Sequence, residues 1–377
     1  MPPRPRLDPL DTVEEKVAHG RRLSEADGLA LLRSADLLRV GRLADSVRRQ
    51  RNADDVYFVV NRHINYTNVC RNRCRFCAFS RSPGEPGAYT LTEEEVLAKA
   101  QQAIHDGATE IHIVGGEHPE LPYDAVRAMV SGIRELAPSV HIKAFTASEI
   151  AHFADALGRD VGEVLDDLRA AGLDSLPGGG AEILGPRVRR VVCPEKISGE
   201  RWLDIHRQAH GKGLTSNATM LYGHLDTYED RVDHLLRLRA VQDETGGFRA
   251  FIPLAFQPKN TALAHLPPTT GVDDLKTMAT ARLILDNFAH IKTYWVMTGL
   301  KLAQVALYFG ADDMDGTVVE EVISLLSGSD FGQEVAKNEL VRVIADAGRV
   351  PVERDGAYRI VRRYDRTASA GDEVHGA

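Results

Sequence analysis

Cysteine is scarce in this sequence, with four residues among 377. So few cysteines in a long chain do not resemble the disulfide framework of a small secreted protein, and clustered cysteines in a reducing compartment more often bind metal or carry out redox chemistry. Basic residues are not in excess either, because the formal net charge is −8. Bulk electrostatics therefore gives no reason to expect nucleic-acid binding.

Long apolar runs are also missing. A transmembrane helix needs about 18 or more consecutive apolar residues, and no such stretch occurs. The opening residues, MPPRPRLDPL, lack the apolar segment of a signal peptide. We therefore expect a cytoplasmic protein without a membrane span. What the chain does have is a hydrophobic fraction of 43%, which is enough for a large core.

Short β-rich segments alternate with helical segments along most of the chain. HIKAFT, LTSNATMLYG and FRAFIPLAF each follow a predicted helix. Such alternation predicts a parallel sheet with helices outside it, and about eight units favour a (β/α)8 TIM-type barrel over an open doubly wound sheet. We expect an N-terminal helical extension over 1–54, the barrel over 55–326, and a C-terminal α/β extension with a flexible tail over 327–377.

Four shorter segments carry more specific predictions. Residues 56–68, VYFVVNRHINYTN, are expected to lead through the first barrel strand into the loop that follows. Thr92 and Glu95 have the spacing of a capping box, which starts a helix. Residues 350–361, VPVERDGAYRIV, indicate a strand pair, and the final segment, ASAGDEVHGA, is typical of a disordered tail.

Three of the cysteines, Cys70, Cys74 and Cys77, lie in one arginine-rich loop directly after the first predicted strand. This loop opens at the face where barrel enzymes carry their active sites. Structural zinc usually takes four ligands, but Cys193 is remote in the sequence and the loop contains no histidine. Thiolates also bind iron–sulfur clusters, and a four-iron cubane on three thiolates keeps one iron open for a substrate or cofactor. A scaffold cluster or a zinc knuckle is the alternative.

The spacing C-x3-C-x-aromatic-C, with Phe76 as the aromatic residue, resembles the signature of the radical S-adenosylmethionine (SAM) superfamily. The resemblance implies a [4Fe–4S] cluster on the three cysteines, whose open iron chelates the amino and carboxylate groups of SAM. It also implies that Gly115, Gly116 and Glu117, the segment GGE after the second barrel strand, bind the SAM amino group through backbone carbonyls. Glycine suits this role because the ligand must approach bare backbone; an ordinary turn is the alternative.

Longer segments resemble the aminofutalosine synthase family of the futalosine route to menaquinone. They extend over about residues 55–325 and include RHINYTNVCRNRCRFCAFSR, GATEIHIVGGEHPELP, VHIKAFTASEI and GADDMDGTVVEE. The segments GGGAEI and QDETGGF are shared with dehypoxanthine futalosine cyclase and the deazaflavin (FO) synthases, which remain the alternatives. Glu117 departs from the leucine expected in many relatives, but it restores the general superfamily pattern GGE.

The family resemblance also implies the reaction. The substrate would be 3-[(1-carboxyvinyl)oxy]benzoate, and SAM would be consumed as a co-substrate. The 5′-deoxyadenosyl radical adds to the alkene, the aryl group migrates and the carboxyl group is lost, giving 6-amino-6-deoxyfutalosine and methionine. A reductant such as flavodoxin or ferredoxin would supply the electron. A non-catalytic iron–sulfur electron carrier is the alternative from a different class.

Further polar residues are candidates for binding SAM. Glu182, in GGGAEI, offers two acceptor oxygens to the ribose diol; a helix N-terminal glutamate is the alternative. Arg207 and His210 are candidates for the SAM carboxylate, unless they lie on a solvated or core-lining helical face. Phe76 is a candidate to flank the adenine, unless it packs within its loop.

A substrate with two carboxylates needs cations or hydrogen-bond donors in a confined pocket. Polar residues near the ends of predicted strands are the candidates, together with two in adjoining loops; for each, an ordinary polar contact of the barrel is the alternative. Cys193 is expected to be a small buried side chain. The candidates are His63, Asn65, Lys143 and Thr146 on the strand ends, and His118 and Glu149 in the loops.

Overall fold

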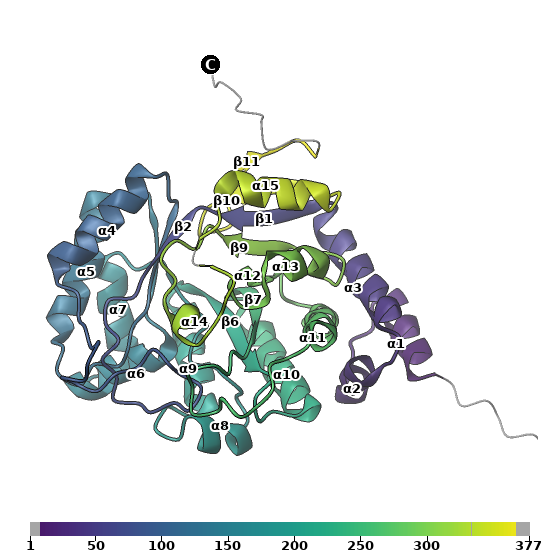
Figure 1. Ribbon diagram of the computed structural model, residues 1–377, viewed down its shortest axis with the longest axis horizontal. Helices are drawn as coiled ribbons and strands as arrows, with labels where there is room; N and C mark the ends of the chain where they lie inside the picture. The colour runs from purple at the N-terminus through teal and green to yellow at the C-terminus, as the bar shows by residue number, and fades with distance from the viewer. Residues whose placement is uncertain (1–7, 333, 367–377) are drawn as a thin grey trace, which may run out of the picture.

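The computed structural model describes residues 8–332 and 334–366 (Figure 1). Within them, seven parallel strands form one sheet in the order β2-β3-β4-β5-β6-β7-β8. Neighbours in the sheet are neighbours in the sequence, as expected for successive strand–helix–strand units. The predicted tail over 368–377 lies outside the described residues. The strands are β2 (Asn61–Ile64), β3 (Glu110–Ile113), β4 (His141–Ala144), β5 (Ser175–Leu176), β6 (Thr215–Tyr222), β7 (Phe248–Ala255) and β8 (His290–Ile291).

β9 (Asp313–Gly316) forms the eighth side of the barrel. Isolated bridges connect it to the seven-stranded sheet: Lys292 pairs with Asp313 beside β8, and Arg62 of β2 pairs with Val319 beyond β9. Val318 has a φ of 50°, and such a backbone does not continue an extended ladder. The predicted TIM-type arrangement is therefore confirmed, with the difference that the barrel is partial and its last side is closed by single bridges.

A second sheet has the order β11-β10-β1-β9. Its strand β1 (Asp55–Val59) comes from the segment that was expected to lead into the barrel as a single strand, so that segment divides at Val60 and only β2 enters the barrel. β1 pairs in parallel with β10 (Val350–Arg354). The predicted C-terminal strand pair is confirmed, since β10 pairs antiparallel with β11 (Ile360–Arg363).

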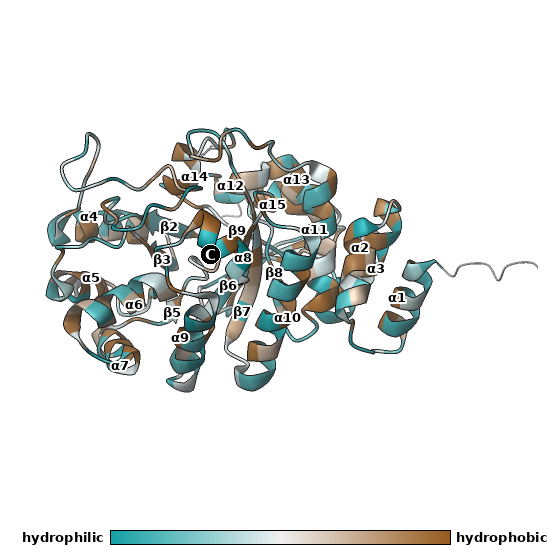
Figure 2. Cartoon of the chain, turned by 90° about the horizontal axis from the view of Figure 1, so that it is seen from below, coloured by the Kyte–Doolittle hydropathy of each residue, from teal (hydrophilic) through white to brown (hydrophobic). Residues whose placement is uncertain are grey.

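Helices surround the barrel, and α3 packs against α11, which places the N-terminal helices beside the barrel (Figure 1). Figure 2 shows hydrophilic and hydrophobic residues on different sides of many outer helices, as expected for helices that cover a sheet. Within the described residues, no helix has the length and apolar character needed to cross a membrane. The helices are α1 (Pro9–Ala18), α2 (Glu25–Arg33), α3 (Leu37–Asn52), α4 (Glu93–His105), α5 (Tyr123–Leu136), α6 (Ala147–Leu157), α7 (Val161–Ala171), α8 (Pro186–Val192), α9 (Gly199–Gly211), α10 (Tyr228–Thr245), α11 (Gly271–Ile284), α12 (Trp295–Thr298), α13 (Leu300–Ala306), α14 (Ile323–Leu326) and α15 (Lys337–Asp346).

Capping boxes fix the starts of several helices. The predicted box of Thr92 and Glu95 is present at the start of α4. A second box joins Thr146 and Glu149 at the start of α6, directly after β4. Each box satisfies backbone N–H groups that the first turn of a helix leaves without a partner. Thr146 and Glu149 are therefore held in place at the end of β4 where we expected functional residues.

Candidate active site

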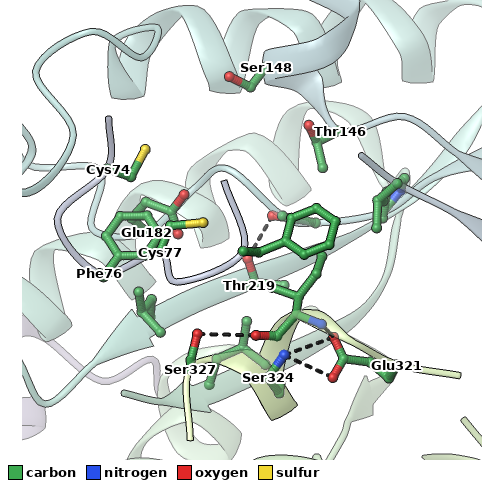
Figure 3. A pocket seen from close by; sticks show the side chains of 18 of the residues that line it. Cys74, Phe76, Cys77, Thr146, Ser148, Glu182, Thr219, Glu321, Ser324 and Ser327 are labelled. Carbon is green, nitrogen blue, oxygen red and sulfur yellow. Dashed lines mark hydrogen bonds between the residues drawn. The ribbon is translucent and has the colours of Figure 1, made fainter. Parts of the chain in front are cut away.

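A cavity of about 280 Å³ opens among the C-terminal ends of the barrel strands. Figure 3 shows Cys74, Phe76, Cys77 and Glu182 gathered on one side of it. This is the end of the barrel at which enzymes of this architecture place their chemistry. Most of the residues predicted from sequence line this cavity: His63, Cys70, Cys74, Phe76, Cys77, Gly115, Gly116, Glu117, Lys143, Thr146, Glu149 and Glu182.

The cysteine loop connects β2 to α4 and is fixed by backbone hydrogen bonds at several points. The Cys70 N–H donates to the carbonyl of Arg81 at 3.0 Å, and the Cys77 N–H donates to the carbonyl of Cys74 at 3.1 Å. The Arg75 N–H donates to the carbonyl of Val192 at 2.8 Å, which ties the loop to the end of α8. The three cysteines are free thiols that line the same cavity, so the fold brings them together as the motif predicts.

The three thiols suit an iron–sulfur cluster, because in a cubane each thiolate binds a different iron. Among the described residues, no group of three or more His, Cys, Asp or Glu side chains is arranged for one metal ion. Burial raises the pKa of Cys74 well above its usual value, and nearby Lys196 opposes that rise. Asn72 also lines the cavity, and both polar atoms of its amide are buried without a partner among the described residues. These residues fit a [4Fe–4S] cluster.

Gly115 and Gly116 pack directly against the start of the cysteine loop. A Cβ atom on Gly116 would lie 2.3 Å from the carbonyl oxygen of Val69 and 2.9 Å from the Cβ of Cys70. A Cβ atom on Gly115 would lie 2.6 Å from the ring of Tyr66. Side chains at these positions would push the loop away, so glycine is required for the contact as well as for access to the backbone.

Glu182 and Lys196 form a charged pair beside the cysteines. The Lys196 ammonium lies 2.8 Å from Glu182 Oε1 and 5.8 Å from the centre of the Phe76 ring. Burial opposes ionisation of Glu182, but Lys196 outweighs it and the net effect lowers the pKa of that carboxyl. Glu182 also has a φ of 45°, an uncommon backbone for a residue with a side chain. The surroundings thus hold an ionised carboxylate and an ammonium against the cysteine loop.

We call Cys70, Cys74, Cys77, Gly115, Gly116, Glu182 and Lys196 the cysteine-loop end of the cavity. The other end is built from a row of paired strand residues. In the sheet register His63 pairs with His112, and His112 pairs with Lys143. These three and Lys292 line the cavity and form what we call the histidine–lysine end.

Both lysines of the histidine–lysine end have buried acidic partners. Lys143 lies 2.6 Å from Glu110, and Lys292 lies 2.7 Å from Asp315. Burial opposes ionisation of Glu110, yet Lys143 and Lys292 lower its pKa well below the usual value. Each lysine and its carboxylate partner therefore form an ionised pair that is buried in the barrel.

Glu149 and Thr146 line the cavity but also serve the start of α6. Glu149 accepts hydrogen bonds at 3.0 Å from the Tyr66 hydroxyl and from the Gly115 N–H. It also accepts one from the backbone N–H of Thr146, the N-cap residue of α6. Burial raises the pKa of Glu149 to about 7, and these hydrogen bonds reduce the rise. Glu149 therefore connects the glycine pair with the end of β4.

Four predicted residues lie away from the cavity lining. Asn65 donates to the carbonyl of Val114 at 3.2 Å. His118 accepts at Nδ1 from two backbone N–H groups of its own loop. Arg207, on α9, forms an ion pair with Glu244, and His210 contacts the hydroxyl of Ser216 at 2.8 Å. The positions of Arg207 and His210 match the alternative we gave for them, a helical face that is solvated or packed on the core.

Sequence reasoning missed several residues that line the cavity, among them His112, Lys196, Lys292 and Glu321. His112 was accessible to prediction, because it is the register partner of His63 on the next strand. Lys196 and Lys292 lie outside the motifs that we recognised. Burial raises the pKa of Glu321 to about 7, but no local pattern in the sequence indicates that it is buried.

Comparison with known families gives two matches that together extend over most of the chain. Residues 64–238 match the model of the radical SAM superfamily, and residues 245–366 match the model of the CofH/MqnC C-terminal region. The first match begins at the end of β2 and includes the cysteine loop and the glycine pair.

Curated relatives cover nearly the whole chain. Aminodeoxyfutalosine synthase of Thermus thermophilus is 49% identical over 96% of this chain and 98% of that protein. The protein of the same name from Streptomyces coelicolor is 46% identical over 94% of both chains. A 5-amino-6-(D-ribitylamino)uracil–L-tyrosine 4-hydroxyphenyl transferase of Methanopyrus kandleri is 42% identical over 89% of this chain and 92% of that protein.

Solved structures agree on the architecture. HydG, a maturase of the [FeFe]-hydrogenase, superposes with a TM-score of 0.73 over 95% of this chain and 79% of its own, at 18% identity. Methylornithine synthase (PylB) superposes with a TM-score of 0.72 over 90% of this chain and 97% of its own, at 19% identity. At such identities the likeness concerns the fold alone.

Proposed function

Because the chain belongs to the radical SAM superfamily and, within it, to the aminodeoxyfutalosine synthase family, we propose that it joins the 5′-deoxyadenosyl group of SAM to 3-[(1-carboxyvinyl)oxy]benzoate. The aryl group moves from oxygen to carbon and the carboxyl group of the enol ether is lost, which gives 6-amino-6-deoxyfutalosine and methionine. This reaction belongs to menaquinone biosynthesis in the cytoplasm. The main structural support is one cavity with three thiols at one end and a histidine–lysine row at the other.

At the cysteine-loop end, the chain binds and orients SAM. Cys70, Cys74 and Cys77 would hold a [4Fe–4S] cluster, which would supply the electron that cleaves SAM after reduction by a flavodoxin or ferredoxin. Glu182 accepts hydrogen bonds from the ribose hydroxyls, and Lys196 keeps this carboxylate ionised. The Gly115 and Gly116 backbone packs against the cysteine loop, and its carbonyls would accept hydrogen bonds from the SAM amino group there.

At the histidine–lysine end, the chain binds the acid. Ile252, Leu254 and Phe256 form an apolar wall of the same cavity, which is suited to the aryl ring. Enclosure by this wall keeps water and other hydrogen donors from the reacting carbons, and fixed ends hold the alkene close to the 5′ carbon. The residues of the barrel therefore contribute orientation and exclusion of solvent.

The relatives named 4-hydroxyphenyl transferases support a second function. They are 39–42% identical to this chain, below the 46–49% of the synthases. The reaction in their name moves a 4-hydroxyphenyl group from tyrosine to 5-amino-6-(D-ribitylamino)uracil. A dehypoxanthine futalosine cyclase is the remaining alternative, because the segments GGGAEI and QDETGGF also resemble that group.

Product analysis separates these functions. The reconstituted enzyme is incubated without oxygen with SAM, dithionite and one of three substrates: the enol ether, dehypoxanthine futalosine, or tyrosine with 5-amino-6-(D-ribitylamino)uracil. We expect 6-amino-6-deoxyfutalosine from the first mixture and no turnover product from the other two. Turnover of either other mixture in place of the enol ether would contradict the proposal.

A further inference from the structure

Charge is balanced within the histidine–lysine end before any substrate is present. Lys143 is paired with Glu110 and Lys292 with Asp315, at 2.6 and 2.7 Å. All four side chains are buried. Two cations and two anions leave no spare positive charge for a substrate with two carboxylates. A lysine that moved to the substrate would leave its carboxylate buried and unpaired, which is strongly unfavourable.

The rings of His63 and His112 form no hydrogen bond or ion pair with another described residue. Their ring centres are 4.3 Å apart and the ring planes are inclined by 34°. His63 is 5% exposed, and its Nε2 atom is buried with no hydrogen-bond partner among the described residues. A buried polar atom without a partner costs free energy, so such an atom in a cavity wall points to a ligand.

The groups that face His63 come from four sides of the barrel. Glu110 and His112 lie on β3, Lys143 lies on β4, Lys292 follows β8, and Asp315 lies on β9. Their formal charges sum to zero when His112 is neutral. Burial lowers the pKa of His63 to about 4, and burial lowers that of His112 well below the usual value. Both rings are therefore neutral near pH 7 in the absence of substrate.

We propose that the His63–His112 pair binds a carboxylate of the acid substrate and takes up one proton from solvent as the substrate binds. The proposal rests on the proposed function for the identity of the acid. The proton goes to a free ring nitrogen of the pair, and the resulting imidazolium donates a hydrogen bond to the carboxylate. No bond of the substrate forms or breaks in this step. The pair thus supplies the positive charge that the balanced lysines do not.

Glu321 is the competing proton acceptor. It lines the same cavity, accepts hydrogen bonds from the backbone N–H groups of Ile323 and Ser324, and has no cationic partner among the described residues. Burial raises the pKa of Glu321 to about 7, so an incoming anion would also favour its protonation. Variants of the two sites distinguish these acceptors.

Calorimetry measures the proton directly. The oxidised holoenzyme, which cannot turn over, is titrated with the enol ether at about pH 7.5 in phosphate, HEPES and Tris, whose ionisation enthalpies differ. The dependence of the binding enthalpy on the buffer gives the number of protons taken up, for which we expect about one per acid bound. Because the ligand raises the pKa of the pair, the affinity should fall by up to about ten-fold per pH unit as the pH rises from 6 to 8.

The variants give the decisive comparison. His63→Gln should abolish most of the proton uptake, flatten the pH dependence and weaken binding by about ten-fold or more. Glu321→Gln should retain the uptake, as should the control His265→Gln, which changes an exposed histidine. If His63→Gln does not fold, His112→Gln is used with the same expectation, and iron content and circular dichroism report on folding.

Three results overturn the inference. The wild type binds the acid with no proton uptake, or His63→Gln keeps the full uptake, or Glu321→Gln loses it. In each case the enol ether still binds, so the proposed function stands. Failure of the wild type to bind the enol ether at all contradicts the proposed function itself, and the inference falls with it.

Discussion

The two ends of the cavity are built in opposite ways. The cysteine-loop end comes largely from one continuous segment, with the glycine pair and the Glu182–Lys196 pair packed against it. The histidine–lysine end takes its side chains from β2, β3 and β4 and from the residues after β8. A continuous segment can be recognised as a sequence motif, whereas side chains from different strands come together only through the register of those strands. The comparison teaches that cluster chemistry can be recognised from local sequence, whereas the substrate end needs the assembled barrel.

The two ends also differ in electrostatics. At the cysteine-loop end, burial raises the pKa values of Cys70 and Cys74, and Lys196 favours the thiolates. Neither thiol forms an ion pair within the described part of the chain, and each would bind a metal group as the thiolate. At the histidine–lysine end the charges are already paired, and the histidines are neutral. At the first end, burial keeps Cys70 and Cys74 protonated until a metal group binds, whereas the charges of the second end are paired before its ligand arrives.

The largest expected effect breaks the cysteine-loop end alone. Cys74→Ala should reduce SAM cleavage to background, because the cluster loses one of its three protein ligands. Cys193→Ala is the matched control, since Cys193 is buried but does not line the cavity, and it should retain cleavage. The measurement is methionine release under dithionite, together with iron per chain. Undiminished cleavage by Cys74→Ala would show that the loop does not hold the cluster.

The second prediction breaks the histidine–lysine end. Lys143→Met leaves the Glu110 carboxylate buried without its partner, and breaking a buried pair in this way costs about 3–5 kcal/mol of unfolding free energy. The double variant Lys143→Met/Glu110→Gln removes both charges and should recover most of the loss. Urea unfolding followed by circular dichroism measures both variants, with iron content unchanged in the folded protein. A single variant as stable as the wild type would mean that the pair is not charged.

Two glycine substitutions test how tightly the cysteine-loop end is packed. Gly116→Ala places a methyl group 2.3 Å from the Val69 carbonyl oxygen, and such overpacking costs about 1–3 kcal/mol and displaces the cysteine loop. Gly211→Ala is the control, because a Cβ there meets nothing within 4 Å. We expect Gly116→Ala to lose iron on reconstitution and Gly211→Ala to retain it. Equal iron content in both variants would show that Gly116 is not needed to position the cysteine loop.

The smallest expected effect concerns the affinity for SAM. Glu182→Ala should weaken SAM binding by about ten-fold or more, since a hydrogen bond to a charged group contributes roughly 1.5–3 kcal/mol. Iron content and binding of the enol ether should not change, because Glu182 lies at the other end of the cavity from His63. An unchanged dissociation constant for SAM would leave Glu182 as a partner of Lys196 only.

The barrel and the cysteine-loop end could be predicted because each depends on a pattern of residues that are close together in the sequence. Strand–helix alternation indicates the parallel sheet, and the cysteine spacing and GGE identify the loop and the glycines that pack on it. The division of the first predicted strand at Val60 was not predictable, because β1 pairs with β10 from the far end of the chain. Lys292 was missed for a similar reason, whereas His112 was missed although its register partner His63 lies on the neighbouring strand. Whether the side chains of Lys292 and His112 meet in the cavity depends on which strands become neighbours. Arg207 was predicted to reach SAM, but the sequence did not determine which way this helical residue faces, and it pairs with Glu244 instead.

The fate of the adenosyl group tests the central claim most directly. SAM labelled with ¹³C in its adenosyl moiety is turned over with a saturating amount of the enol ether, and the products are quantified by mass spectrometry. If the cysteine-loop end generates the radical and the histidine–lysine end holds the alkene beside it, the label passes into 6-amino-6-deoxyfutalosine in an amount equal to the methionine formed. Release of labelled 5′-deoxyadenosine as the main product would contradict this account.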